Sequence, residues 1–375
     1  LLPRRADSWT YDRTLARILD ERLPLIFAGQ QPIQGANPDL EEPQGEPLSS
    51  LIPFVRDSVF IVSSDWNIPI DIGAGELTVG VIDTLGGAIR AVVLQVRDGE
   101  GHILARADDR LATLTHQKLT FPWQRFDEVI KEVSAKVFLS SHRLSPARRS
   151  NVGQLTFALI PLLLREEIEY QRIGDSWVFI VETQLDRPGF RKGRYSQAYY
   201  ARALRFGGTD VAARIPSIKT IMTKKVVLAG AGCLGAASAL EFAKAQIREI
   251  RVADFDLVEP ATIVRWPIGM SAVGRGKALV LREVIRRDYP LTHVEILEKR
   301  IGGTVEFGSA TVAELEQFCD GVDLIFDATV DDGVNDTLAE IAQQNNVPYI
   351  CISGTPGARG GRVICIVPGE EMCWD

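Results

Sequence analysis

Short apolar runs and amphipathic segments alternate regularly over residues 224–367. Runs such as KVVLAG at 225–230 predict buried strands, and the segments at 234–245 and 277–287 predict helices. Strands that alternate with helices of this length are typical of a mostly parallel, doubly wound sheet. We therefore predict an α/β domain over residues 212–375.

The first half of the chain shows a different pattern. Residues 8–23 predict an amphipathic helix, and residues 28–50, which are rich in Pro, Gly and acidic groups, predict a linker. Between residues 58 and 108, β-branched runs are separated by turns that contain Gly and Asp, so this region predicts strands. Another strand is expected at residues 177–183.

Helices are expected alongside and after these strands, at residues 126–137, 154–168 and 196–205. Strands first and helices afterwards are typical of an α+β domain. The chain is therefore expected to have three parts. They are a helix with a mobile linker (1–54), a non-catalytic α+β domain (55–211) and the doubly wound α/β domain (212–375).

The composition is that of a soluble globular protein, with 46% hydrophobic and 24% charged residues. A net charge of −7 argues against a broad nucleic-acid-binding surface, and no apolar run reaches the roughly 18 residues of a membrane span. The N-terminus has no signal-peptide pattern, and five cysteines, an odd number, argue against a disulfide framework and for the cytoplasm. The missing initiator Met and the end two residues after Cys373 indicate that both ends are trimmed.

A glycine-rich loop follows the first strand of the α/β domain and opens a helix. Gly230, Gly232 and Gly235 match the pattern GxGxxG, and Cys233 lies inside the loop. Such glycines let the backbone turn tightly and approach a phosphate or ribose closely. Asp254 follows the next strand, where a carboxylate can accept hydrogen bonds from ribose hydroxyls. These features predict a nucleotide site and fit both NAD(P) and ATP.

Two cations downstream favour ATP. Arg265 lies nine residues after Asp256, and Lys277 begins a helix just after the sequence VGRG. An Arg can bind phosphate oxygens with two nitrogens and a Lys adds a point charge, so both suit a triphosphate. This segment has no counterpart in a hydride-transfer enzyme.

The order of these motifs resembles the family of ubiquitin-activating (E1-like) enzymes and ThiF-type adenylyltransferases. That family combines a GxGxxG loop, an Asp-x-Asp at the second strand, an Arg about nine residues later and a Val-Gly-x-x-Lys. The matching residues here are Gly230, Gly232, Gly235, Asp254, Asp256, Arg265, Val273, Gly274 and Lys277. Within this family, the Trp266-Pro267 pair after Arg265 most resembles the same position in activating enzymes of bacterial ubiquitin-like conjugation systems in antiviral defence.

The resemblance implies a Rossmann-like adenylation domain over 212–375 that uses ATP and Mg²⁺ and is incomplete at its C-terminus. Such an enzyme adenylates the C-terminal glycine of a ubiquitin-like protein, and thioester transfer to a conjugating enzyme follows in many members. The resemblance also implies that Arg265, Lys277 and Asp331 are catalytic. The cofactor-binding residues it implies are Gly230, Gly232, Cys233, Gly235, Asp254, Asp256, Arg265 and Lys277.

The chain departs from the family pattern at two positions. Thr262 stands where the family usually has an Asn. Val330 falls where the family has a Mg²⁺-binding Asp. Because Val has no oxygen ligand for a metal, we assign this role to Asp331, one residue later.

The cysteines suggest one further metal site. Cys373 resembles the first ligand of the family's zinc-binding Cys pairs, which implies a structural Zn²⁺. None of the cysteines has the pattern of a thioester-forming residue. The other four, which are expected to be buried structural thiols, are Cys233, Cys319, Cys351 and Cys365.

Residues 1–210 contain no Cys. The N-terminal domain is therefore expected to be either E2-like without a catalytic Cys or an inactive adenylation-like half, in both cases a docking scaffold. Expected partners are a ubiquitin-like protein, an E2-like conjugating enzyme and a second copy or pseudo-copy of the chain, with no nucleic acid and no membrane.

Two other functions remain open. An NAD-dependent oxidoreductase would explain the glycine loop and Asp254 but would leave Arg265 and Lys277 without a role. A non-catalytic scaffold with a decayed ATP site would explain Thr262 and Val330. Nucleotide preference and pyrophosphate exchange distinguish these alternatives from an adenylating enzyme.

Overall fold

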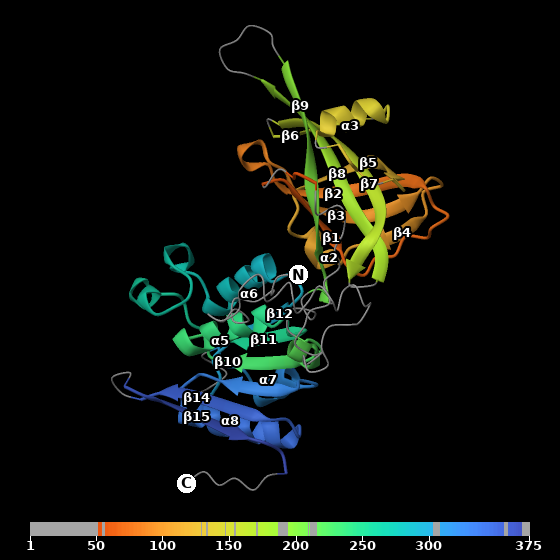
Figure 1. Cartoon of the computed structure of the whole chain (residues 1–375). Helices are drawn as coiled ribbons and strands as arrows, with labels where there is room; N and C mark the ends of the chain where they lie inside the picture. The colour runs from red at the N-terminus through yellow and green to blue at the C-terminus, as the bar shows by residue number, and fades with distance from the viewer. Residues whose placement is uncertain are drawn as a thin grey trace, which may run out of the picture. The chain divides into compact units, whose positions relative to one another are not determined.

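The computed structural model describes two β-sheets, one of nine strands and one of six (Figure 1). It covers residues 52–369, apart from gaps at 55–56, 129, 133, 147, 154, 170–171, 187–193, 209, 211–215, 303–307 and 356–358. The helix expected at 8–23, the linker at 28–50 and Cys373 lie outside the described residues. Within them, no helix is both long and apolar enough to span a membrane.

The first sheet contains strands β1 to β9. Their bounds are β1 (Val59–Ser63), β2 (Ala74–Asp83), β3 (Arg90–Asp98), β4 (Ile103–Arg106), β5 (Gln117–Arg125), β6 (Arg149–Val152), β7 (Leu155–Glu169), β8 (Arg172–Asp186) and β9 (Arg194–Phe206). The pairing order β1-β9-β8-β7-β5-β2-β3 returns from β3 to β1, so these seven strands close into a ring. Strand β4 pairs with β3, and β6 pairs with β7.

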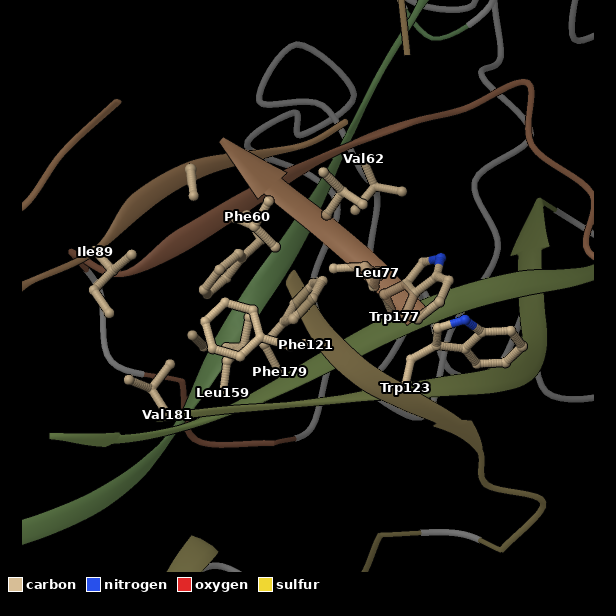
Figure 2. Close-up of a cluster of buried hydrophobic side chains, with 14 of the residues drawn as sticks. Phe60, Val62, Leu77, Ile89, Phe121, Trp123, Leu159, Trp177, Phe179 and Val181 are labelled. Atoms are coloured by element: carbon tan, nitrogen blue, oxygen red, sulfur yellow. The ribbon is translucent and has the colours of Figure 1, made fainter. Parts of the chain in front are cut away.

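The ring encloses a core of apolar side chains (Figure 2). Side chains alternate between the two faces of a strand, so Leu77, Val79 and Val81 of β2 all point into this core. Phe60 and Phe179 stack in it with ring centroids 4.2 Å apart. Such an aromatic pair adds about 0.5–1.5 kcal/mol beyond the burial of its area.

Residues 154–168, which we expected to form a helix, belong to strand β7 from Leu155 onward. Phe157 and Leu159 join the core of the ring, whereas Ile160 and Leu162 join a second cluster with helix α3 (Ala135–Ser141). The segment is apolar throughout because both faces of the strand are buried. A run of this kind cannot be distinguished from a buried helix by its periodicity.

Residues 196–205 also form a strand, β9, and the predicted helix there was wrong. Strand β9 pairs with β8 on one side and with β1 on the other, so long-range pairing overrode the local pattern. Among the described residues of the helix expected at 126–137, those from Ala135 onward are helical, as α3, and the earlier ones are not. The strand expected at 177–183 is confirmed within β8. The described N-terminal part is mainly β, in contrast to the expected strands followed by helices; its other helices are α2 (Asp109–Ala112) and the short 3-10 helix η3 (Leu85–Gly87).

The second sheet is the predicted doubly wound one. Its order is β12-β11-β10-β13-β14-β15, and all neighbours are parallel except β14 and β15. The strands are β10 (Lys225–Ala229), β11 (Glu249–Ala253), β12 (His293–Leu297), β13 (Leu324–Asp327), β14 (Tyr349–Gly354) and β15 (Gly361–Ile366). Helices α5 (Cys233–Lys244) and α6 (Lys277–Asp288) cover one face, and α7 (Val312–Cys319) and α8 (Asp332–Gln344) cover the other. Short 3-10 helices lie at η4 (Pro216–Thr220), η5 (Pro260–Val264) and η6 (Met270–Ala272).

The strand order reverses beside β10. From β10 the chain goes to β11 and β12 on one side and then returns to β13 and β14 on the other. In sheets of this type, ligands bind outside the carboxyl ends of the strands at the reversal. The loop after β10 and the residues that follow β11 and β13 lie at these ends, so the topology brings the candidate site residues together.

Candidate nucleotide-binding site

The glycine loop joins β10 to α5, and its glycines have different reasons to lack a side chain. Gly230 has φ +81°, and a Cβ there would lie 2.8 Å from the Ala328 carbonyl. A Cβ on Gly235 would lie 1.8 Å from the Gly230 oxygen, because α5 packs directly on the loop. A Cβ on Gly232 would meet no described atom within 4 Å, so the space beside this residue is open to a ligand.

Replacing Gly235 with alanine should destabilise the α/β domain by about 1–3 kcal/mol, since the loop must move to admit the methyl group. The loop backbone is held by hydrogen bonds, so this movement also disturbs the nucleotide site. Urea denaturation measures the loss. Gly232→Ala is the matched control and should stay within about 0.5 kcal/mol of wild type, because its φ is −66° and the added Cβ meets open space. Equal stability of the two variants would contradict the expected clash.

Asp254, directly after β11, holds the glycine loop. One carboxylate oxygen accepts the Ala231 N–H at 2.6 Å, and the other accepts the Asp256 N–H at 2.7 Å. Burial raises the pKa of Asp254, and these two hydrogen bonds and the charge of Lys277 oppose that rise. The carboxylate keeps lone pairs for a further donor, so its role toward a ribose hydroxyl stays a prediction.

Lys277 is the first residue of α6, and its Nζ lies 2.8 Å from a carboxylate oxygen of Asp256. Its side chain is 13% exposed, and its own N–H donates to the Asp256 carbonyl at 2.9 Å. Contacts therefore run without interruption from the loop through Asp254 and Asp256 to this ammonium group. The structure brings together these three residues, which the sequence had placed in one site.

Arg265 ends the 3-10 helix η5 and is exposed, without an ion pair to any described residue. The next residue, Trp266, is buried, and its indole N–H donates to the Ala231 carbonyl at 2.8 Å. This bond places the segment that carries Arg265 beside the glycine loop. Thr262, which stands at the family's Asn position, donates to the Glu259 carbonyl at 2.7 Å within its own turn.

Sequence reasoning did not find this role of Trp266. The residue appeared only as part of the resemblance, and nothing in the local pattern indicates a bond to a loop 35 residues earlier. A bulky aromatic residue directly after the exposed Arg265, in a segment rich in short polar turns, was the single available signal.

Asp331 caps the N-terminus of α8. One of its oxygens accepts the N–H groups of Gly333 and Val334 at 3.1 and 3.3 Å, and the other makes no hydrogen bond to a described residue. Val330 adopts the left-handed φ of +59° and is exposed, and this turn lets Asp331 take the position at the start of the helix.

A second carboxylate near this loop is already occupied. Asp327 is fully buried and accepts hydrogen bonds from the Thr329 N–H and hydroxyl and from the Tyr349 hydroxyl, the last at 2.7 Å. The described residues contain no group of three His, Cys, Asp or Glu side chains arranged to hold a metal. A magnesium ion held by one carboxylate and by phosphate oxygens needs no such group, so Asp331 fits that mode of binding.

The cysteines divide differently from the expectation. Cys319 and Cys351 are buried as predicted, and burial raises the pKa of the Cys319 thiol to about 11. Cys233 and Cys365 are exposed, so their prediction as buried thiols was wrong. Cys233 begins α5 at the open side of the loop, and Cys365 lies on β15, the edge strand of the sheet.

The chain is similar to several known proteins. Residues 200–375 match the profile of the ThiF family. Over its full length, the chain is 28% identical to an uncharacterised protein, y4qC, of Sinorhizobium fredii and covers 65% of it. The probable adenylyltransferase/sulfurtransferase MoeZ of Mycobacterium tuberculosis is 32% identical over 35% of this chain and 32% of its own. The ATP-dependent ubiquitin transferase-like protein Cap2 of Enterobacter hormaechei is 25% identical over 48% of this chain and 31% of its own.

The chain spans about two thirds of the length of y4qC and about a third of MoeZ and Cap2. The part matched by the family profile contains the glycine loop, Asp254, Arg265 and Lys277. It also contains all the described strands of the doubly wound sheet, β10 to β15. The similarity to the ThiF family therefore covers the C-terminal part of the chain, which carries the glycine loop and this sheet.

Proposed function

We propose that the protein uses ATP to adenylate the C-terminal glycine of a ubiquitin-like protein. The observation that carries the proposal is the unbroken set of contacts from the glycine loop through Asp254 and Asp256 to Lys277. These contacts connect the Lys277 ammonium to the glycine loop, where the space beside Gly232 is open to a ligand. The names of two relatives, an adenylyltransferase and an ATP-dependent ubiquitin transferase-like protein, support the same activity.

In the proposed reaction, an oxygen of the substrate's C-terminal carboxylate forms a bond to the α-phosphorus of ATP. The bond from this phosphorus to the oxygen that bridges to the β-phosphate breaks, and pyrophosphate leaves with the electron pair. Negative charge develops on the oxygens around the α-phosphorus and on the leaving oxygen, and Lys277 and Arg265 offset it. The rest of the rate enhancement comes from positioning the carboxylate in line with the bond that breaks.

The proposal is tested by ATP–pyrophosphate exchange with a panel of ubiquitin-like proteins that end in glycine. Exchange should require the protein, Mg²⁺ and an intact C-terminal glycine, and a substrate shortened by that glycine is the control. ATP binding without exchange for any member of the panel would favour a non-catalytic scaffold. Thermal stabilisation by NADH but not by ATP with Mg²⁺ would favour an oxidoreductase.

Asp331 is proposed to hold the magnesium ion, which when bound supplies positive charge to the phosphate oxygens. Replacing Asp331 with Asn should raise the Mg²⁺ concentration for half-maximal exchange by about tenfold, since a metal ligand is weakened. Asn caps a helix as well as Asp does, so α8 should keep its start. Asp332→Asn, at the neighbouring exposed carboxylate, is the control. An equal rise in the Mg²⁺ concentration for half-maximal exchange in both variants would contradict the assignment of Asp331 as the metal ligand.

Further parts of the proposal rest on the family resemblance. They include thioester transfer to an E2-like conjugating enzyme, a structural Zn²⁺ with Cys373 as a ligand, and assembly with a second copy of the chain. The strand ring of β1 to β9 is proposed to dock the substrate protein or the conjugating enzyme. A place in an antiviral conjugation system in the cytoplasm is part of the same proposal.

A further inference from the structure

Two side chains hold the Ala231 residue of the glycine loop from opposite ends. The Asp254 carboxylate accepts its N–H at 2.6 Å, and the Trp266 indole N–H donates to its carbonyl at 2.8 Å. Trp266 is 5% exposed and packs in the core cluster beneath α5 and α6, so its ring has one position. Neither peptide group on the two sides of Ala231 can rotate without breaking one of these bonds.

The bond from Trp266 also determines where the next N–H points. A trans peptide is planar, and its C=O and N–H point in opposite directions. With the Ala231 carbonyl directed at the indole, the Gly232 N–H is directed away from it. This N–H makes no hydrogen bond to a described residue, and the space around the Gly232 α-carbon is open.

We propose that Trp266 is a positioning residue that orients the Gly232 N–H toward an anionic oxygen of the bound nucleotide. The inference rests on the proposed nucleotide site, and it adds a residue that contacts the loop and not the ligand. An unpaired N–H that is already oriented costs no rearrangement when an oxygen arrives. The indole N–H, and not the bulk of the ring, is the group responsible.

The test compares Trp266→Phe, which removes the N–H and keeps an aromatic ring, with Trp123→Phe as the matched control. Trp123 is 1% exposed in the strand ring, and its indole N–H also donates to a backbone carbonyl, that of Arg97, at 2.8 Å in a partly buried bond. Titration calorimetry with ATP and Mg²⁺ should give a Kd about tenfold higher for Trp266→Phe and an unchanged Kd for Trp123→Phe. Both variants should lose similar stability in urea denaturation.

A purely structural role would lower the stability of both variants and leave the Kd for ATP at the wild-type value in both, which would overturn the inference. A second comparison adds Trp266→Phe to Gly232→Pro, which has no N–H at residue 232 and whose ring suits the observed φ of −66°. In that background Trp266→Phe should change the Kd no further. A further tenfold loss would show that Trp266 acts through some other group.

The measurements separate this inference from the proposed reaction. If Trp266→Phe weakens ATP binding while the wild-type protein catalyses no pyrophosphate exchange, the inference stands and the proposed function fails. If exchange occurs and the Kd is the same in wild type and Trp266→Phe, the function stands and the inference fails. A wild-type protein that binds no ATP would overturn both.

Discussion

Replacing Lys277 with alanine should lower the rate of pyrophosphate exchange by about 100-fold to 1000-fold. Its ammonium lies 2.8 Å from a carboxylate oxygen of Asp256. Asp256 follows Asp254 by two residues, and the Asp254 carboxylate accepts the Ala231 N–H of the glycine loop. In the proposed reaction, charge grows at the α-phosphorus, so a fixed cation stabilises the transition state more than it stabilises bound ATP. The loss should therefore appear mainly in kcat, with a smaller change in the KM for ATP. Exchange rates measured over a range of ATP concentrations give kcat and the KM for ATP separately.

The matched control is Lys244→Ala. Lys244 also forms an ion pair with a carboxylate, Glu241, but on the outer side of α5, where its side chain is 52% exposed. Exposed pairs contribute about 1 kcal/mol or less to stability, and this lysine lies outside the site, so the variant should keep the wild-type rate. A Lys277→Ala protein that is folded and retains more than about a tenth of the wild-type rate would contradict the assigned role.

Replacing Arg125 with alanine should destabilise the strand ring by about 3–5 kcal/mol. Arg125 and Asp175 have side chains that are each 6% exposed, and their closest nitrogen and oxygen lie 3.6 Å apart. Arg125 also donates to the carbonyl oxygens of Ile68 and Pro69, and Asp175 accepts the Ile68 N–H at 2.7 Å. Removing the guanidinium leaves a buried carboxylate without its counter-charge and the carbonyls without a donor. Urea denaturation followed by tryptophan fluorescence measures the loss.

Arg106→Ala is the control for the buried pair. Arg106 lies 2.7 Å from Asp109 in the same sheet region, but their side chains are 65% and 80% exposed, so the loss should stay below about 1 kcal/mol. The double variant Arg125→Met with Asp175→Leu should be more stable than either single alanine variant, because it leaves no unpaired buried charge. Equal effects of Arg125→Ala and Arg106→Ala would contradict the interpretation.

Local sequence was sufficient for the α/β domain. Its strands and helices are each short, each helix presents one apolar face to the sheet, and these patterns can be read from near neighbours. The GxGxxG spacing depends on the chain geometry of a single turn, in which a side chain on Gly235 would meet the Gly230 oxygen. The position of Asp254 could also be predicted, because it directly follows a strand and parallel strands end at one edge of the sheet.

Local sequence was insufficient where burial or contacts came from distant parts of the chain. Strand β7 is buried on both faces by residues of other strands and of α3, which removes the alternation that marks a strand. The left-handed φ of Val330, which precedes Asp331 at the start of α8, was also not predicted, because periodicity does not report backbone dihedrals. The resemblance aligned Val330 with the family's metal-binding Asp, and we assigned the role to Asp331 because Val has no oxygen ligand; the structure shows Asp331 at the start of α8, and its role toward Mg²⁺ stays a prediction.

By itself, the sequence determined that this chain contains a doubly wound domain with a nucleotide-type glycine loop and two cations downstream. Those features depend on residues a few positions apart, whose relative geometry is set by one strand, one turn or one helix. Only the tertiary structure decided that the preceding strands close into a ring, that Asp254 holds the loop, and that Trp266 bonds to Ala231. Each of these depends on contacts between residues more than 20 positions apart, and hydrophobic patterning specifies which faces are buried but not which partners meet there.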